Sequence, residues 1–380
     1  MLTKAMSGTM KSMTTSLIIP ALASMMLASP EAQAQSYKRE PAKVTPDNFN
    51  RAESDLIFSG LVRDGSFGKL VHNRELAPIG FPIVRPNRDT LYSGAVFDYD
   101  AGPVTITLPD SGARFMSMLV IDQDQFAPAV VHGAGRHVLS RAQIGTRYAM
   151  AEIRTLVDPR NPHDLQEAHR LQEAIAVEQA RRGWFQAPAW DRASQTRVRN
   201  ALVALGRTVH DSRGMFGSRS QVDPIRHLIG TAVHWGGNPE DEATYLNVTP
   251  PLNDGTTVHQ LTVRDVPVDG FWSISVYDAD GYFEPNARQA YSVNSLTTTR
   301  SRDGSVTVLF GGRDTQAANC LAIMAGWNYM VRLYRPRPEI LSGRWVFPVA
   351  TPVAKDQPRA SRLPRRRLET RIAAEQYMRA

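Results

Sequence analysis

Cysteine is almost absent from this sequence: Cys320 is the only one among 380 residues. A single cysteine excludes an intrachain disulfide, so the fold must be stabilised by packing, whatever the redox state of its compartment. No neighbouring residue marks Cys320 as an activated nucleophile, so a catalytic thiol is not predicted.

Several motifs of common enzymes are also missing. The nine histidines form no His-Glu-x-x-His sequence and no zinc spacing with cysteine. There is no Gly-x-Ser-x-Gly elbow, which disfavours an α/β-hydrolase, and no glycine loop that could cradle a phosphate. The aspartate pairs 98/100, 122/124 and 278/280 lack the later glutamate of a calcium loop, so turn formation is favoured over calcium binding. We therefore expect no metal and no cofactor.

The apolar run 17–28 is too short to span a bilayer, so no transmembrane segment is predicted. It follows Lys4 and Lys11 and precedes Ala32-Gln33-Ala34, which together form the pattern of an export signal. We expect residues 1–34 to be removed, the mature chain to begin at Gln35, and the protein to be periplasmic or secreted. A retained anchor is the alternative.

The positive charge is concentrated at the C-terminus. The formal net charge is +7, and residues 355–380 hold eight Lys or Arg against three acidic residues. The remaining body is close to neutral, which argues against a nucleic-acid partner. The run 365–367 could contact an anionic lipid, but a solvated tail is the favoured interpretation.

Hydrophobic patterning changes its period along the chain. Short strands with turn clusters cover about 81–157 and 245–348, whereas helical periodicity covers 45–61, 161–183 and the segment after Asp191. We predict a mainly β fold with a helical connector (α+β), containing two jelly-roll-like β-sandwich domains. The predicted boundaries are a signal peptide at 1–34, an N-terminal sandwich with a leading helix at 35–160, a helical connector at 161–215, a C-terminal sandwich at 216–354 and a basic tail at 355–380.

Residues 270–282 carry the clearest strand signal. Trp272, Ile274 and Val276 share one face at period two, a tight acidic turn follows at 278–281, and a return strand is expected from Tyr282.

This stretch has an internal counterpart. Residues 115–126 align without gaps on residues 271–282, which lie 156 positions later, and five of the twelve pairs are identical. The alignment predicts an internal duplication. Chance similarity between two amphipathic strands is the alternative.

Five longer motifs stand in order: Asn87-Arg88-Asp89-Thr90-Leu91-Tyr92-Ser93, the run 222–230, Trp235-Gly236-Gly237-Asn238-Pro239, the run 267–273, and Gly326-Trp327-Asn328-Tyr329. On these motifs the sequence resembles bacterial exported proteins with paired domains of unknown function, numbered 1254 (N-terminal) and 1214 (C-terminal). The resemblance covers roughly 44–353. It implies an exported two-domain protein with jelly-roll-like β domains, and it carries over no catalytic residue.

The sequence departs from the family pattern at two places. It has Gln123-Asp124-Gln125-Phe126 where the family pattern is Glu-Asp-His-Tyr, and Asn319-Cys320-Leu321-Ala322 where the pattern is Asn-Cys-Leu-Pro. Losing a histidine and a tyrosine hydroxyl beside Asp124 would matter if that turn held a metal or a proton-transfer pair.

Polar clusters mark candidate ligand positions. Asn87, Arg88 and Asp89 stand directly before an apolar strand, and Arg332 lies inside another. Such groups can anchor a carboxylate or a sugar. A buried structural ion pair is the alternative, and it is the favoured one.

The tryptophan loops at 235–239 and 326–329 combine an aromatic face with amide groups and can stack a flat ligand. Equally, each tryptophan could plug the end of a sandwich. His227 flanks an apolar stretch, where a core histidine is the simpler interpretation.

We expect the protein to bind a small polar or carbohydrate-like ligand at the domain junction. The ligand-binding candidates are Asn87, Arg88, Trp235, Asn238, Trp327, Asn328 and Arg332. The alternative is an exported hydrolase or lyase with acid–base groups from Asp89, Asp124, His227 and Tyr329. The sequence leaves open whether the protein is an enzyme and whether it forms a homo-oligomer.

Overall fold

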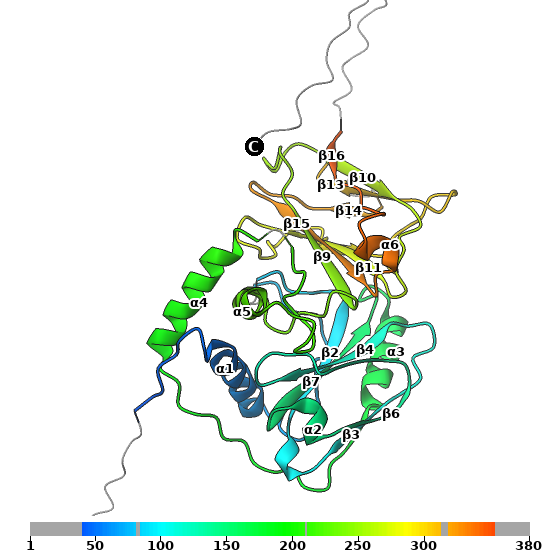
Figure 1. Cartoon of the computed structure of the whole chain (residues 1–380). Helices are drawn as coiled ribbons and strands as arrows, with labels where there is room; N and C mark the ends of the chain where they lie inside the picture. The colour runs from blue at the N-terminus through cyan, green and yellow to red at the C-terminus, as the bar shows by residue number, and fades with distance from the viewer. Residues whose placement is uncertain (1–39, 81–83, 210, 313–317, 354–380) are drawn as a thin grey trace, which may run out of the picture. The chain divides into compact units, whose positions relative to one another are not determined.

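The computed structural model describes residues 40–80, 84–209, 211–312 and 318–353 (Figure 1). The predicted signal peptide and basic tail lie outside these ranges. Within them the chain is mainly β with six helices, which confirms the predicted α+β class. No helix in the described ranges is long and apolar enough to cross a bilayer.

The N-terminal half packs two sheets face to face. The larger sheet has the strand order β1-β2-β7-β4-β5 and the smaller has the order β6-β3-β8. Alternate residues of β2, β4 and β7 point at the smaller sheet, because successive side chains of a strand face opposite ways. They form a core that includes Phe97, Ile106, Met118, Val120 and Ile153. The bounds are β1 Val71–His72, β2 Thr90–Asp98, η1 Tyr99–Ala101, β3 Val104–Leu108, β4 Met116–Asp122, β5 Ala129–His132, β6 Gly135–Leu139, β7 Tyr148–Leu156 and β8 Ala176–Glu178.

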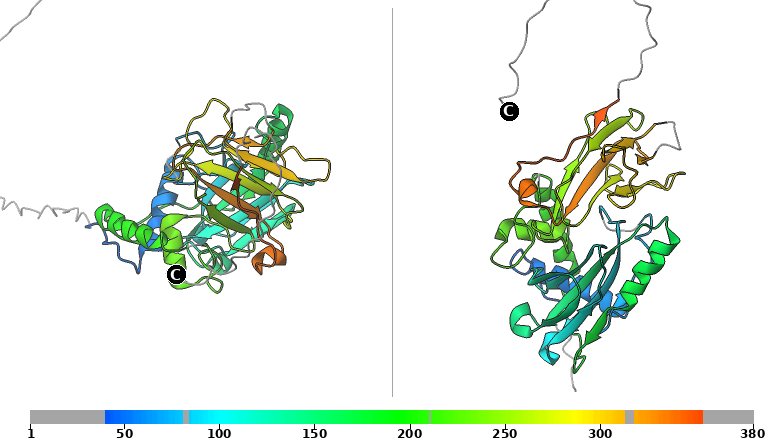
Figure 2. Two further views of the ribbon diagram at one scale, coloured as in Figure 1. Left: turned by 90° about the horizontal axis from the view of Figure 1, so that it is seen from above. Right: turned by 90° about the vertical axis from the view of Figure 1, so that its right-hand side faces the viewer.

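The C-terminal half repeats this arrangement. Its sheets have the orders β12-β11-β15-β9 and β14-β13-β10-β16. Their facing side chains form a second core around Ile274, Phe310, Trp327, Tyr329 and Val331. The right-hand view of Figure 2 shows the two halves in cyan to green and in yellow to orange. The bounds are β9 Ala243–Val248, β10 His259–Val263, β11 Trp272–Tyr277, β12 Ser292–Asn294, β13 Val306–Phe310, β14 Cys320–Leu321, β15 Asn328–Tyr334 and β16 Thr351–Pro352.

Three helices pack together beside the larger N-terminal sheet. Phe49 of α1, Leu202 of α4 and Ile229 of α5 belong to one apolar cluster. Asp191 and Asp223 cap α4 and α5 by accepting hydrogen bonds from backbone N–H groups of the first turn. The helix bounds are α1 Phe49–Arg63, α2 Arg141–Ile144, α3 Pro162–Glu173, α4 Arg192–Gly206, α5 Pro224–Val233 and α6 Pro338–Leu341.

Two local predictions were wrong. The helix predicted for 161–183 ends at Glu173, and residues 176–178 form β8, which pairs with β3. Pairing with a neighbouring sheet outweighs local helix propensity here. The return strand expected at Tyr282 is absent: the antiparallel partner that follows β11 is β12, which begins only at Ser292.

The two halves use corresponding strands in the same chain order. The antiparallel set β2-β7-β4-β5 corresponds to β9-β15-β11-β12, and the antiparallel pair β3·β6 corresponds to β10·β13. The larger sheets also share their register, because Arg154 pairs with Ser117 as Arg332 pairs with Ser273.

The acidic turns of the two aligned segments have the same hydrogen bonds. Asp122 Oδ1 accepts from the backbone N–H of residue 124 at 2.8 Å and of residue 126 at 2.9 Å. Asp278 Oδ1 accepts from residues 280 and 282 at 2.9 and 2.8 Å. An aspartate that binds its own backbone in this way fixes the turn.

Asp122 is 3% exposed, and burial raises the pKa of its carboxyl to about 6. A raised pKa means that ionising Asp122 costs stability as the pH rises from about 4 to about 6. Asp122→Asn keeps the accepting oxygen and never ionises. We expect the variant to gain roughly 2–3 kcal/mol relative to the natural chain over that range, measured by urea unfolding at each pH.

The matched control is Asp110→Asn, since the exposed Asp110 accepts a similar turn hydrogen bond from Gly112 N–H at 2.8 Å. A stability difference between Asp122→Asn and the natural chain that stays constant from pH 4 to pH 7 would contradict this prediction.

Candidate functional site at the junction of the two β regions

The outer faces of the two larger sheets meet at a junction. Phe115, just before β4, contacts the rings of Phe271 and Tyr334, with centroids 5.1 and 5.4 Å apart. These rings share an apolar cluster with Leu156 and Tyr245. Side chains on the outer faces of both sheets are therefore buried against the other half.

Each outer face carries a row of polar residues across four strands. In the N-terminal sheet, Tyr92, Arg154, Ser117 and His132 stand opposite one another on β2, β7, β4 and β5. In the C-terminal sheet, the row on β9, β15, β11 and β12 is Tyr245, Arg332, Ser273 and Asn294. Both rows have an arginine on the second strand and a tyrosine on the first.

Polar contacts link each row to the other half in a mirrored way. His132 Nε2 lies 2.5 Å from an oxygen of Glu242, the residue directly before β9. Asn294 Nδ2 donates to Asp89 Oδ1 at 3.1 Å, and Asp89 is the residue directly before β2. Reciprocal contacts of this kind are typical of a two-fold interface.

The central arginine of each row also contacts the other half. Arg332 is 2% exposed and donates to the backbone oxygen of Arg85 at 2.9 Å, in the segment before β2. It also donates to Tyr277 OH at 2.7 Å. Arg154 is 6% exposed and donates to Gly236 O at 3.4 Å, in the segment before β9, and it forms an ion pair with Glu152.

Burial shifts the acid–base behaviour of the junction. It raises the pKa of the Asp89 and Glu152 carboxyls, and Arg332 and Arg154 offset this only in part. Burial, together with the charges of Arg332 and Arg154, lowers the pKa of His234 to about 4. His234 is therefore neutral at pH 7, whereas the arginines remain cations.

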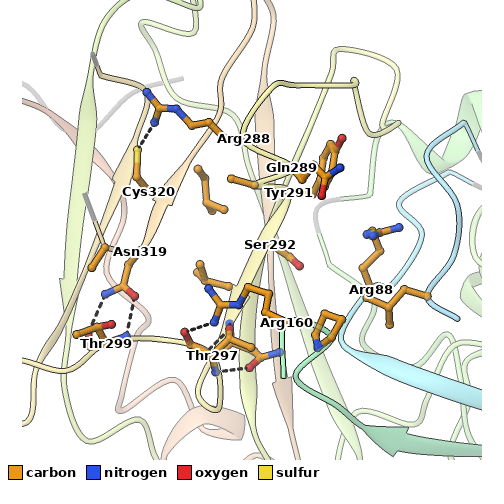
Figure 3. A pocket seen from close by; sticks show the side chains of 17 residues that line it. Arg88, Arg160, Arg288, Gln289, Tyr291, Ser292, Thr297, Thr299, Asn319 and Cys320 are labelled. Carbon is orange, nitrogen blue, oxygen red and sulfur yellow. Dashed lines mark hydrogen bonds between the residues drawn. The ribbon is translucent and has the colours of Figure 1, made fainter. Parts of the chain in front are cut away.

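A cavity of about 320 Å³ lies at one edge of the junction (Figure 3). Arg88 enters it from the N-terminal half, Arg160 from the loop before α3, and Arg288 from the C-terminal half. None of its described lining residues carries a carboxylate. We call it the junction cavity; it is lined by Leu76, Arg88, Pro159, Arg160, residues 288–294, Thr297, Thr299 and residues 318–321.

Six of the candidates named from the sequence lie at the junction: Asn87, Arg88, Asp89, Asn238, Asn328 and Arg332. Asn87 Nδ2 donates to the hydroxyls of Tyr92 and Tyr334 at 3.0 and 3.3 Å. Asn328 accepts from Arg85 at 2.7 Å. Arg88 and Arg332 are the only two of the six that carry a positive charge, and Arg88 is the one that lines the cavity.

The structure does not bring the other five to the same place. Trp327 and Tyr329 are fully buried inside the C-terminal sandwich, and the Tyr329 hydroxyl accepts from Ala350 N–H at 2.9 Å. A ligand at the junction cannot reach them, so their grouping with Arg88 was wrong.

The remaining three lie beside the helices. The ring nitrogens of His227 are 2.8 and 3.0 Å from the backbone oxygens of Met215 and Asp124, and the ring stacks on Phe126 at 4.4 Å. The Asp124 carboxylate pairs with Arg51 at 2.8 Å and with Arg219 at 3.3 Å. Trp235 donates to Ser54 Oγ at 3.0 Å. Protein partners thus occupy all three side chains.

Sequence reasoning missed several junction residues, including Tyr92, Glu152, Arg154, Tyr245, Arg288, Asn294 and Tyr334. A usable signal existed for Arg154, which stands between Ile153 and Thr155 in a strand just as Arg332 stands between Val331 and Leu333. The tyrosines carry no such signal, because strand register decides which of them meet.

Family models match both halves of the chain. Residues 67–141 match a protein of unknown function, DUF1254, and residues 249–338 match a protein of unknown function, DUF1214. The chain carries the paired domains. Their order, 1254 before 1214, is the order that the resemblance predicted.

A solved structure shares the fold. The VPA0106 protein from Vibrio parahaemolyticus is 15% identical with a TM-score of 0.61, over 81% of this chain and 98% of its own. An uncharacterised protein from Burkholderia cenocepacia is 14% identical with a TM-score of 0.45, over 77% of this chain and 84% of its own. No curated protein matches the chain.

Arg332→Ala tests the central contacts of the junction. The change would leave the carbonyl of Arg85, the hydroxyl of Tyr277 and the carboxylate of Asp89 buried without their cation. We expect the free energy of unfolding in urea to fall by about 3–5 kcal/mol. Arg335→Ala, one residue past β15 at an exposed position, is the control and should cost less than about 0.5 kcal/mol. A loss below about 1 kcal/mol for Arg332→Ala would show that the junction does not depend on this arginine.

Proposed function

We propose that the protein binds a small organic anion in the junction cavity. The observation that carries the proposal is the charge of its walls: Arg88, Arg160 and Arg288 line the cavity from different sides, and no carboxylate stands among the described lining residues. Arginine is suited to carboxylates and phosphates because its planar fork offers parallel donors.

The three guanidinium groups are held in place but keep free donors. Arg88 donates to Ala77 O and lies over the ring of Tyr291, with a separation of 5.5 Å. Arg288 donates to Cys320 Sγ at 2.9 Å and to Gly312 O at 2.8 Å. Arg160 binds Thr297 O at 2.7 Å and is partly neutralised by Asp158 at 3.3 Å. Burial lowers the pKa of Arg88, so an anion beside it would offset a desolvation cost.

The neutral lining adds a rigid polar frame. Asn294, Thr297 and Asn319 already bind backbone groups around the cavity. Gln289 and Ser292 make no side-chain hydrogen bond within the described residues, so they can serve ligand hydroxyls. A volume near 320 Å³ is at the low end of ligand pockets and suits a small molecule.

This arrangement favours an anion over a neutral sugar. A sugar would need an open aromatic face on which to stack, whereas Arg88 covers the ring of Tyr291. It also favours binding over the hydrolase or lyase alternative. Asp124, His227 and Tyr329 lie away from the cavity, and only Asp89 adjoins it, through Asn294.

Citrate, phosphate and glucose are the probes that test the proposal by isothermal titration calorimetry. We expect citrate to bind the natural chain and glucose not to bind. Arg88→Gln and Arg288→Gln should each weaken citrate binding about tenfold or more, because a charge-assisted hydrogen bond is lost. Arg344→Gln, at an exposed position outside the cavity, is the matched control and should bind as the natural chain does. Arg88 and Arg288 lie on different walls of the cavity, so if one variant fails to fold the other still provides the test. Unchanged citrate affinity in both variants would overturn the proposal.

We also propose that the halves descend from one duplicated unit. The shared strand order, the mirrored junction contacts and the matching acidic turns support this. The jelly-roll form and the domain boundaries at 160, 215 and 354 remain predictions.

Export remains a proposal that rests on the first 34 residues. Protein recovered from the periplasm or the medium should begin near Gln35 when sequenced from its N-terminus. A chain that remains in the cytoplasm with Met1 in place would contradict it.

A further inference from the structure

A second cavity, of about 250 Å³, lies at one end of the C-terminal sandwich. Val263 is the last residue of β10, Trp272 is the first of β11 and Val306 is the first of β13, and all three border the cavity. At the opposite end of the same strands, Trp327 is fully buried and stacks on Phe310 with ring centroids 5.2 Å apart. Aromatic packing therefore closes one end of the sandwich, and a cavity remains at the other. We call it the sandwich-end cavity.

The inner wall of the sandwich-end cavity is apolar. Val263, Trp272 and Val306 belong to the core of the sandwich and are 4%, 3% and 1% exposed. Val266 and Val268, in the loop between β10 and β11, are half-buried and line the cavity beside them. An apolar cavity of about 150 Å³ holds a benzene molecule. The sandwich-end cavity therefore has room for a ring with a small substituent.

Two donors without protein partners border this wall. The indole N–H of Trp272 makes no hydrogen bond within the described residues, although the residue is only 3% exposed. The hydroxyl of Ser295, directly after β12, makes no side-chain hydrogen bond there either. Most buried donors in proteins have a partner. The cavity is a space that both residues line, so a bound molecule could supply the missing acceptor.

Two exposed arginines also line the cavity. Arg264 belongs to the loop between β10 and β11, and Arg300 belongs to the loop between β12 and β13. Arg264 pairs with Asp265 at 3.3 Å, and Asp265 is the only carboxylate among the described lining residues. Arg300 donates to Gly304 O at 3.3 Å and forms no ion pair within the described residues. The lining therefore carries one cation more than it carries carboxylates.

We propose that the sandwich-end cavity binds a small carboxylic acid that has an apolar ring or branched chain. The apolar group displaces water from Val266 and Val268, which gains hydrophobic free energy. The carboxylate accepts hydrogen bonds from Arg300, with the Trp272 N–H and the Ser295 hydroxyl as further donors. The site shares no lining residue with the junction cavity, and it does not rest on the function proposed above.

Benzoate is the probe that tests the site, by isothermal titration calorimetry at constant ionic strength. Acetate lacks the ring and benzyl alcohol lacks the charge. We expect each of them to bind at least tenfold more weakly than benzoate, because each loses one of the two kinds of contact. Arg300→Gln should weaken benzoate binding about fivefold, since it removes a partly exposed charge-assisted hydrogen bond.

Arg302→Gln is the matched control. Arg302 is exposed in the same loop and does not line the cavity, so this variant should bind benzoate as the natural chain does. Arg88→Gln should also leave benzoate affinity unchanged, and Arg300→Gln should leave citrate affinity unchanged. The two sites are thereby tested apart: a failure of citrate to bind would overturn the proposed function, and a failure of benzoate to bind would overturn the sandwich-end site.

Tryptophan fluorescence provides a second measurement. Benzoate should change the emission of the natural chain, and the change should be absent in Trp272→Phe. If Trp272→Phe fails to fold, the exposed Arg300 still provides the test. Three further results would overturn the site: equal benzoate affinity in Arg300→Gln and Arg302→Gln, loss of benzoate binding in Arg88→Gln, or binding of acetate or benzyl alcohol as tight as that of benzoate.

Discussion

Two buried arginines determine how this protein is assembled. Taking a guanidinium out of water costs several kcal/mol unless hydrogen bonds replace the lost solvation. Arg154 and Arg332 obtain part of those bonds from backbone oxygens of the opposite half, and the rest from their own half, where Arg154 pairs with Glu152 and Arg332 donates to Tyr277. Neither outer face is complete by itself, because its central cation needs acceptors that the other half supplies. The segments before β2 and β9 are positioned by this requirement, and with them Asp89 and Glu242.

The sequence was informative where local chemistry decides the structure. The strand at 272–277, the acidic turn after it and the counterpart 156 residues earlier all follow from alternation and from aspartates that bind their own backbone. The class of the fold follows in the same way. The end of α3 at Glu173 does not, because β8 forms only when its partner β3 is already beside it.

The site was harder to predict, and one error could have been avoided. Residues two apart in a strand share a face, so Tyr329 belongs with Val331 and Leu333, and Asn328 belongs with Arg332. Naming both Tyr329 and Asn328 as groups of one site conflicts with that rule. The meeting of Tyr92 with Tyr334, by contrast, depends on the contact between two sheets. No single-strand pattern contains that information.

The covalent link between the halves has a consequence for the polar character of the junction. Two separate subunits must gain enough from their interface to offset the loss of independent motion, and buried polar groups then weaken the complex. Two halves of one chain meet at a high effective concentration, so that cost is small. A junction inside a single chain can therefore keep buried tyrosine hydroxyls and arginines that a dissociable dimer would have to replace with apolar side chains.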